Sequence, residues 1–556
     1  MSTIEGKTWQ EIVAEKRATQ KALLAPYMLP EDALPAADVL DVVDFIDSCG
    51  ALTATESEIT GISDIAELAA AVAAGTYSAS AVILAYVKRA TIAHQLTNCL
   101  TEVVFEAALE RAAALDKAFA ETGKPVGPLH GVPVTFKDQF NVLGVDTTLG
   151  FVGRSFDPVV DKAKEAVLIT ILERMGAVVL AKSNLPQSIM WPETDNPLWG
   201  RTCNPQRRDF TPGGSTGGEG ALLKLNASIV GWGTDLGGSV RIPMAMAGGY
   251  ALRPGAGRLP YEGVPVTLDG QEHVPSVIGP MTRTLPSLVA ITKAVIDGEP
   301  WTLDPKALPM PWRPAEYTAV KGRKLRIGLM PFDGVVRVHP PVERALREAA
   351  AKLAAAGHEI VPWEANQLHQ ELVPILNSFY SADGGEDVRS AVMKCGEPFV
   401  PYVKAMVNRA PPSTIPQYWK AMVAKRELQK KYLDRWNASG ALTASGEPID
   451  FILCPSMPHT SIPFEHFSWV GYTRVWNGLD YTAVVFPAGT ADRELDAPTA
   501  EQKAYEPVND WDKTNWAIYD IEKMHGLPIS LQLVGRKLEE EKVLAGTEVV
   551  VEALGL

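Results

Sequence analysis

Short apolar runs alternate with helical stretches along most of this chain, and the alternation restricts the folds that it can adopt. The apolar runs are bounded by glycine or proline and lie at residues 132–136, 177–181, 228–233, 325–330, 451–456, 481–487 and 529–535. Apolar residues at helical spacing mark the stretches 165–177 and 340–360 between them. A run that is apolar on both faces needs cover on both, so the pattern predicts an α/β fold with a buried sheet between helices.

The N-terminal part of the chain follows a helical pattern instead. Residues 6–25 place apolar side chains at helical spacing among charges, and further short helices are expected after them. Ser78 or Ser80 is suited to cap the next helix, because a serine hydroxyl accepts a hydrogen bond from the first free N–H groups. No linker or repeat divides the remainder. We therefore expect an N-terminal helical arm over residues 1–75 and a single domain over residues 76–556.

Composition and charge exclude several classes of protein. The net charge of −14 and the pI near 5.3 argue against a nucleic-acid partner, which would need basic patches. The five cysteines are sparse and have no CxxC or zinc-like spacing, as is typical of reduced intracellular thiols. The N-terminus has no continuous apolar run, and no stretch is long enough to cross a bilayer. We expect no transmembrane segment and a cytoplasmic location.

The strongest chemical signal is a pair of glycine-flanked serines together with a lysine. Ser215 and Ser239 stand 24 positions apart, and Lys137 directly follows the apolar run 132–136. If that run is a buried strand, the lysine enters or borders the core, where an unpaired ammonium group is costly. Such a lysine either loses its proton and serves as a base near pH 7 or pairs with a carboxylate such as that of Asp138. Both interpretations stay open on these residues alone.

The backbone around Ser239 is suited to bind negative charge. Gly237 and Gly238 permit conformations closed to other residues and leave the N–H groups unobstructed. Successive N–H groups from Leu236 to Ser239 can face one concavity and stabilise a developing oxyanion. A tight turn or a phosphate-binding loop is the alternative, although neither a GxGxxG nor a P-loop pattern is present there.

Ser215 also matches a different nucleophile motif. Residues 213–217 satisfy G-x-S-x-G, the nucleophile elbow of α/β-hydrolases. That elbow needs an apolar strand immediately before it, whereas residues 204–212 form a polar, proline-containing segment. Such a hydrolase also needs a histidine further along the chain, for which the candidates are His459, His466 and His525. A histidine-dependent serine esterase therefore remains an alternative.

The combination of these motifs resembles the amidase signature family. Lys137, GGSTGGEGALL at 213–223 and GTDLGGSVRIP at 233–243 occur in the family's order and spacing, within a signature region of about 127–263. The resemblance extends over nearly the whole chain, to HGLPISLQLVGR near the C-terminus. Within the family, the pair Glu219-Gly220 makes the chain resemble the branch of fungal acetamidases and related fatty-acid amide hydrolases.

The resemblance implies a catalytic role for each matching position. Ser239 corresponds to the acylated nucleophile, Ser215 to a bridging serine that often follows a cis peptide bond, and Lys137 to the base. The oxyanion hole corresponds to the N–H groups of Leu236, Gly237, Gly238 and Ser239. Asp235, Arg241 and Thr216 correspond to residues that support these groups, or else are purely structural.

The resemblance also points to residues that would surround a substrate. Ile189 and Met190 fall where relatives line the site, and Trp191 and Trp232 are bulkier than the residues usual there. Trp476, with its neighbour Asn477, is expected to close the pocket from the C-terminal side. Packing in the core is the alternative for the tryptophans.

From the resemblance we expect the amidase signature fold, with a central mixed β-sheet between helical layers. The expected activity is hydrolysis of small to medium aliphatic or aromatic primary amides without metal or organic cofactor, with esters and carbamates left open. A homodimer is expected from relatives alone. The alternatives are a long-chain fatty-acid amide hydrolase, an amidotransferase subunit and a non-catalytic scaffold of the same fold.

Overall fold

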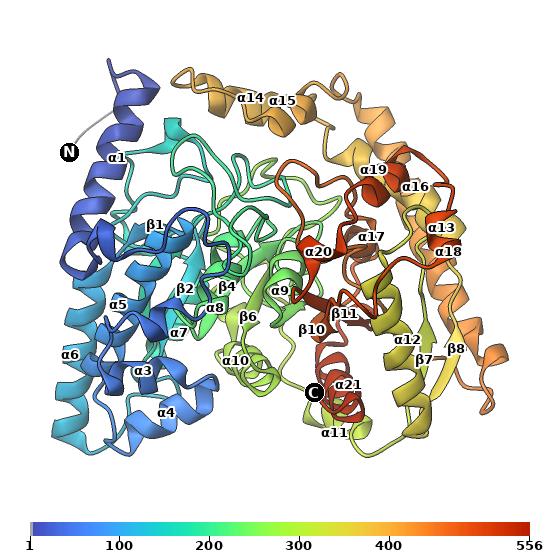
Figure 1. Ribbon diagram of the computed structural model, residues 1–556, viewed down its shortest axis with the longest axis horizontal. Helices are drawn as coiled ribbons and strands as arrows, with labels where there is room; N and C mark the ends of the chain where they lie inside the picture. The colour runs from blue at the N-terminus through green and yellow to red at the C-terminus, as the bar shows by residue number, and fades with distance from the viewer. Residues whose placement is uncertain (1–3) are drawn as a thin grey trace.

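The computed structural model describes residues 4–556, and a single sheet of eleven strands runs through these residues (Figure 1). The strands, in their order across the sheet, are β1 (Leu100–Val103), β3 (Val178–Ser183), β2 (Pro133–Lys137), β4 (Val230–Asp235), β6 (Val277–Thr282), β5 (Tyr250–Arg253), β10 (Ala483–Thr490), β11 (Pro528–Val534), β9 (Phe451–Pro455), β7 (Arg326–Leu329) and β8 (Glu359–Pro362).

The sheet is mixed. β2 is parallel to both β3 and β4, and β7 is parallel to β8 and β9, whereas β10 is antiparallel to β5 and β11. The predicted α/β fold with a central mixed sheet is thus confirmed. All seven predicted apolar runs contribute to strands, and β1, β5, β6 and β8 are additional. β8 lies where a helix was expected over 340–360, because Gly357 at φ +87° turns the chain after the helix ends.

Helices cover both faces of the sheet. The N-terminal half supplies α1 (Trp9–Leu24), α2 (Phe45–Ser48), α3 (Ala54–Gly61), α4 (Ile65–Ala73), α5 (Ala79–Thr97), α6 (Phe105–Thr122), α7 (Val167–Arg174), α8 (Gly217–Lys224), α9 (Arg241–Ala247) and α10 (Leu285–Asp297). The C-terminal half supplies α11 (Pro314–Val320), α12 (Pro340–Ala355), α13 (Asn366–Phe379), α14 (Glu386–Met393), α15 (Pro401–Val407), α16 (Ile415–Ala438), α17 (Gly471–Leu479), α18 (Ala500–Lys503), α19 (Asp510–Ala517), α20 (Ile521–Met524) and α21 (Glu540–Leu554).

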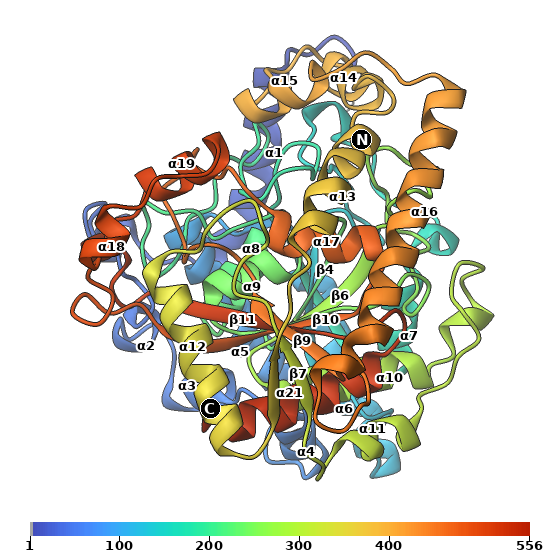
Figure 2. The same cartoon turned by 90° about the vertical axis from the view of Figure 1, so that its right-hand side faces the viewer.

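The pleat of β10 shows why two helical layers are needed. Val484 and Phe486 pack into one hydrophobic cluster with α12 and α21, while Ala483 packs into another with α13 and α17. Alternate side chains of a strand point to opposite faces, so each face of this apolar strand has its own cover. Figure 2 shows α17 and α21 on opposite sides of β10 and β11.

The N-terminal helices begin where the sequence places capping residues. Ser78 accepts a hydrogen bond from the N–H of Ala81 at the start of α5, as expected for one of the two candidates. α3 and α4 pack against α5 and α10, and their apolar residues join the core of the N-terminal half. The separation of an arm over residues 1–75 from a domain over 76–556 stays a prediction. Within residues 4–556, no helix combines the length and apolar character that crossing a bilayer requires.

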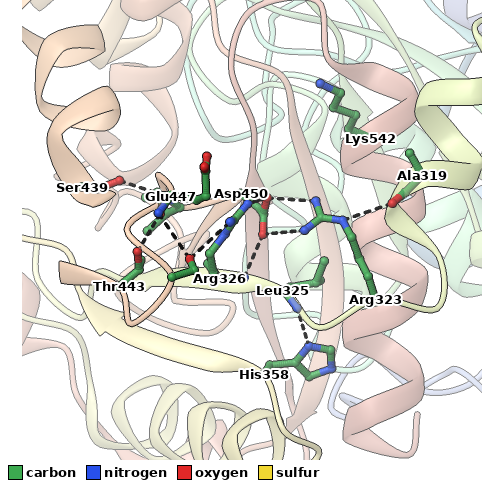
Figure 3. Close-up of polar contacts among 12 residues, drawn as sticks. Ala319, Arg323, Leu325, Arg326, His358, Ser439, Thr443, Glu447, Asp450 and Lys542 are labelled. Carbon is green, nitrogen blue, oxygen red and sulfur yellow. Dashed lines mark hydrogen bonds and ion pairs between the residues drawn. The ribbon is translucent and has the colours of Figure 1, made fainter. Parts of the chain in front are cut away.

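A half-buried acidic residue fixes the outer edge of the sheet (Figure 3). Asp450, just before β9, accepts hydrogen bonds from the guanidinium groups of Arg323 and Arg326 at 2.9–3.0 Å and from the backbone N–H of Arg326 at 2.9 Å. His358 Nδ1 accepts a hydrogen bond from the N–H of Leu325 at 3.0 Å. These contacts align the start of β7 with both of its neighbours.

Candidate active site

Strand β2 delivers Lys137 into the protein interior. The strand lies between β3 and β4, and the lysine side chain at its end is fully buried. Lys137 Nζ donates hydrogen bonds to Ser215 Oγ at 2.6 Å and to Thr234 Oγ1 at 3.0 Å. Thr234 in turn donates to Gln139 Oε1 at 2.7 Å, which leaves its oxygen free to accept from the lysine.

Lys137 has no carboxylate partner within ion-pair distance in residues 4–556. Asp138, the partner considered from the sequence, instead accepts hydrogen bonds from Thr101, from Thr148 and from the N–H of Leu149. Burial lowers the pKa of Lys137 to about 7, although the negative charge of Asp235 acts to raise it. A substantial neutral fraction therefore exists at neutral pH, as a general base requires.

Ser215 is held in a tightly packed loop before α8. Its peptide bond with Gly214 is cis, and its side chain is 1% exposed. A Cβ on Gly214 would lie 2.7 Å from the N atom of Glu193, so only glycine fits there. Thr216, the first residue after Ser215, packs against Gly233 of β4, where a Cβ would come within 2.6 Å of it. The segment 204–212 contains turns and isolated bridges rather than a strand, so the nucleophile-elbow context is missing.

A buried ion pair fixes the loop between β4 and α9 that carries Ser239. Asp235 accepts hydrogen bonds from the Arg241 guanidinium at 2.9 and 3.0 Å, from Asn477 Nδ2 at 2.8 Å and from the N–H of Gly238 at 2.8 Å. Burial acts to raise the pKa of Asp235, but Arg241 and Asn477 outweigh it and lower that pKa to about 2. Asp235, Arg241 and Asn477 thus form one buried cluster below the loop. Their predicted support of the catalytic groups stays a prediction.

Three of the four N–H groups expected in the oxyanion hole are free. Gly238 donates its N–H to Asp235, whereas the N–H groups of Leu236, Gly237 and Ser239 have no acceptor among residues 4–556. The carbonyls of Leu236 and Gly237 accept from Tyr380 Oη at 2.8 Å and Thr473 Oγ1 at 2.7 Å. The Leu236–Gly237 peptide plane is thus fixed from its carbonyl side, which leaves the N–H of Gly237 for a ligand.

Ser239 is half-buried and lines a cavity of about 550 Å³. Ile189, Met190 and Trp191 line the same cavity, in agreement with where they were expected. Trp191 stacks on Tyr402 with ring centroids 4.7 Å apart, so its ring is held in place. Contact of these residues with a substrate stays a prediction.

Two of the predicted pocket tryptophans lie elsewhere. Trp232 on β4 and Trp476 on α17 are fully buried in hydrophobic clusters and are not among the residues that line the cavity. The geometry places both in the core, as the packing interpretation holds. Asn477 is likewise not at the cavity wall.

The histidines considered for an esterase lie outside the cavity wall. None of His459, His466 and His525 lines the cavity with Ser239. His459 Nδ1 lies 2.7 Å from the carbonyl of Thr460, and burial lowers its pKa to about 4. His525 accepts a hydrogen bond from the N–H of Arg493.

A larger cavity of about 1170 Å³ lies elsewhere, beside the loop after β5, and contains none of the predicted catalytic residues. Several charged groups at its wall pair with each other, as Lys537 does with Asp480 at 3.0 Å and Arg536 with Glu539 at 3.0 Å. Of these two cavities, only the smaller one is lined by Ser239.

A protein-family model described as Amidase matches residues 81–544. The chain belongs to the amidase family. Amidase 1 of Gibberella moniliformis is 49% identical over 477 residues, or 86% of this chain and 90% of that protein. The acetamidase of Emericella nidulans is 38% identical over 556 residues, or 99% of each. A solved structure described as fatty acid amide hydrolase has a TM-score of 0.91 at 32% identity, and the match covers 100% of this chain and 96% of that one.

The predicted resemblance and fold are thereby confirmed, and this amidase is a hydrolase that acts on amide bonds. Its local motifs were visible in the sequence, but several wall and support residues were not. Thr234 lies inside the motif at 233–243 but was not singled out from the sequence. Tyr380, just after α13, and Thr473 and Arg474 on α17 come from far along the chain. Only the folding of α13 and α17 over the Ser239 loop brings them there.

Proposed function

We propose that this amidase hydrolyses its substrate through an acyl-enzyme on Ser239, with Ser215 and Lys137 as a proton relay. The observation that carries the proposal is the 2.6 Å hydrogen bond between Lys137 Nζ and Ser215 Oγ, made by a buried lysine without an acidic partner. The lowered pKa of Lys137, about 7, supports a neutral lysine as the base.

In this mechanism neutral Lys137 takes the proton of Ser215, which takes the proton of Ser239 as its oxygen attacks the amide carbonyl. The free N–H groups of Leu236, Gly237 and Ser239 donate to the oxyanion of the tetrahedral intermediate. Ser215 then gives a proton to the departing nitrogen, so that ammonia or a neutral amine leaves. Water attacks the acyl-enzyme with the same relay as base, and the carboxylic acid is released with Ser239 regenerated.

The substrates we propose are small to medium aliphatic or aromatic primary amides. Aromatic side chains of Trp191, Phe467 and Trp469 line the cavity, whose volume of about 550 Å³ suits a compact molecule. The similarity to the acetamidase of Emericella nidulans supports small amides. Long-chain fatty-acid amides are the second candidate, favoured by the likeness to the solved fatty acid amide hydrolase.

The experiment is ammonia release by the purified protein from acetamide, hexanamide, benzamide and oleamide, with Ser239→Ala as the control. We expect turnover of the smaller amides and none in Ser239→Ala. Replacing Lys137 with alanine should lower kcat by about 10²–10⁴-fold, the usual contribution of a positioned base. Substantial turnover by Ser239→Ala would refute the mechanism, while preference for oleamide would favour the second candidate.

The same protein sample distinguishes this amidase from an amidotransferase subunit, a scaffold and an esterase. Activity on free amides by the chain alone argues against an amidotransferase subunit, and mass-spectrometric mapping of a fluorophosphonate label to Ser239 argues against a scaffold. A histidine-dependent esterase would lose activity in His459→Gln, His466→Gln or His525→Gln and would tolerate the loss of Lys137.

A further inference from the structure

Two arginines give the wall of the active-site cavity a positive charge. Arg474 on α17 and Arg409, just after α15, line the cavity together with Ser239, and no aspartate or glutamate of the described residues is among the lining residues. Neither guanidinium group has a carboxylate within 4.0 Å in residues 4–556. The four fully buried arginines of the described residues, Arg89, Arg241, Arg253 and Arg258, each pair with a carboxylate. The partly buried Arg474 and the exposed Arg409 have none in this part of the chain.

Arg474 lies close to the nucleophile loop. Its Cγ and Cδ atoms are 3.8 and 3.9 Å from the position that a Cβ on Gly237 would occupy, two residues before Ser239. Nη1 donates a hydrogen bond to Asn377 Oδ1 at 2.8 Å, and the guanidinium lies 5.9 Å from the ring centroid of Tyr380. Nε is buried without any hydrogen-bond partner. Most of the donors of this guanidinium are therefore unused by the protein.

The charge on Arg474 cannot be removed by deprotonation at neutral pH, since guanidinium groups in proteins stay protonated. Burial lowers its pKa, Tyr380 acts to raise it, and the neighbouring positive charge of Arg409 lowers it further. Arg474 is a partly buried cation with unused donors and lies next to a second cation. The described residues supply no negative charge to balance it, so we expect a ligand to do so. The planar fork of a guanidinium matches a carboxylate.

We propose that the amide substrate of this enzyme also carries a carboxylate, remote from the scissile bond, which Arg474 binds while Arg409 adds electrostatic attraction at the outer wall. Among the proposed primary amides, the monoamides of dicarboxylic acids are the chemical class that fits. N-acyl amino acids carry the same carboxylate on a secondary amide and extend the test to that class. Arg474 is then a specificity-determining residue. The inference rests on the proposed amide hydrolysis and narrows its substrate class.

The test compares amides of equal shape and different charge. Glutaramate, which ends in a carboxylate, is paired with 5-methylhexanamide, in which an isopropyl group replaces the carboxylate, and with the cationic 5-aminopentanamide. Longer monoamides up to suberamate and the N-acetyl derivative of 4-aminobutyrate cover other separations between the two groups. We expect kcat/KM for the best carboxylate to exceed that of its neutral isostere by at least about tenfold, because hydrogen bonds to charged groups are among the stronger ones.

The variants assign the effect to one residue. Arg474→Gln should lower the ratio of kcat/KM for the carboxylate substrate to kcat/KM for its isostere to about one, whatever the activity on the isostere itself, and Arg474→Lys should retain part of the preference. Arg409→Gln should reduce the preference less and make it less sensitive to salt. Arg426→Gln on the exposed side of α16 is the matched control and should change nothing.

The proposal is overturned if the neutral isosteres are hydrolysed as well as the carboxylates, or if the preference survives in Arg474→Gln. Because Arg474→Gln loses the bond from Nη1 to Asn377, its folding is checked by circular dichroism. If Arg474→Gln does not fold, binding is measured by calorimetry instead. Glutaramate and 5-methylhexanamide are titrated into Ser239→Ala and into the double variant Ser239→Ala/Arg409→Gln. Equal binding of the two ligands to Ser239→Ala would overturn the proposal. Binding of glutaramate without turnover of any amide by the wild type would refute the proposed function and leave the carboxylate site standing.

Discussion

Burial changes the chemistry of Lys137. The lysine ends a strand that is apolar on both faces, so desolvation lowers its pKa to about 7, while Asp235 offsets part of that effect. Asp235 does not become its partner, because the aspartate is already bound to Arg241 and Asn477. Their different neighbours thus keep Lys137 partly deprotonated at neutral pH and keep Asp235 negatively charged.

The pH dependence of kcat/KM should report this lysine. Because the neutral amine is the proposed base, activity is expected to rise with pH through an apparent pKa near 7 and to level off above it. The measurement is kcat/KM for a neutral amide from pH 5 to 9. A profile that is flat over this range, in a protein that stays folded, would contradict the assignment.

Gly238 illustrates a requirement for glycine that is steric as well as conformational. It lies at φ +128°, and a Cβ there would come within 2.3 Å of Thr473 Oγ1. That threonine holds the carbonyl of Gly237, so a side chain at 238 would displace the free N–H groups beside Ser239. Backbone strain and a clash are therefore combined at one position.

Gly489 in β10 makes a matched control, because it has φ +132° and nothing within 4 Å of its Cβ position. Gly489→Ala should cost only the strain of the backbone, about 1–3 kcal/mol of unfolding free energy. Gly238→Ala should cost more than this and also lower kcat by at least about tenfold. The two variants are compared by urea unfolding and by turnover of the same amide. If Gly238→Ala and Gly489→Ala changed kcat equally, the clash of residue 238 with Thr473 would have been relieved by a shift of the structure.

At the scale of elements, α8 packs a carboxyl group against the sheet. Glu219 is fully buried and accepts a hydrogen bond from Thr135 Oγ1 of β2 at 2.6 Å. Its Oε2 would lie 2.2 Å from a Cβ on Gly231, so the glycine in β4 makes room for it. Burial raises the pKa of Glu219 to about 8, although the hydrogen bond from Thr135 acts to lower it. At pH 7, α8 therefore packs against β2 and β4 with the carboxyl group of Glu219 in its neutral form.

This packing predicts a pH-dependent stability. The pKa of Glu219 is near 4.5 when unfolded and about 8 when folded, so the folded state binds more protons between these values. The contribution of the neutral acid is fully present below pH 4.5 and is lost as pH rises through 8. Glu219→Gln removes this titration, so the difference in unfolding free energy between wild type and variant should decrease from pH 5 to 8. Urea unfolding at several pH values measures it, and parallel curves would contradict the prediction.

At the scale of the whole molecule, the two ends of the sheet have different roles. One end carries the candidate active site, and the other is a structural edge. β2 and β4, which hold Lys137 and lead to Ser239, lie near one end of the strand order, while β9, β7 and β8 lie at the other. In the proposed mechanism the C-terminal half still contributes, because Tyr380 and Thr473 hold the loop that carries Ser239. The outer edge instead depends on Asp450 between two arginines.

Removing the charge of Asp450 should therefore reduce stability without changing catalysis. Asp450→Asn leaves two partly buried arginines without their carboxylate and is expected to cost about 1–3 kcal/mol of unfolding free energy, with kcat/KM unchanged. Asp434→Asn is the control, since Asp434 forms an exposed pair with Lys430 worth at most about 1 kcal/mol. Denaturant unfolding and turnover are measured on both. A fall in kcat/KM for Asp450→Asn would show that the two ends of the sheet are coupled.

The sequence by itself determined the elements whose signal is local. Runs of β-branched and apolar residues specified seven of the strands, Ser78 specified the start of α5, and the glycine-serine motifs with Lys137 identified the family, because each depends on neighbouring residues. Tertiary structure alone decided the rest. It buried Trp232 and Trp476 in the core, turned the end of the 340–360 stretch into β8, and brought Tyr380, Thr473 and Arg474 to the loop of Ser239. Such contacts join residues more than a hundred positions apart, and no local pattern encodes which distant side chain will fill a given space.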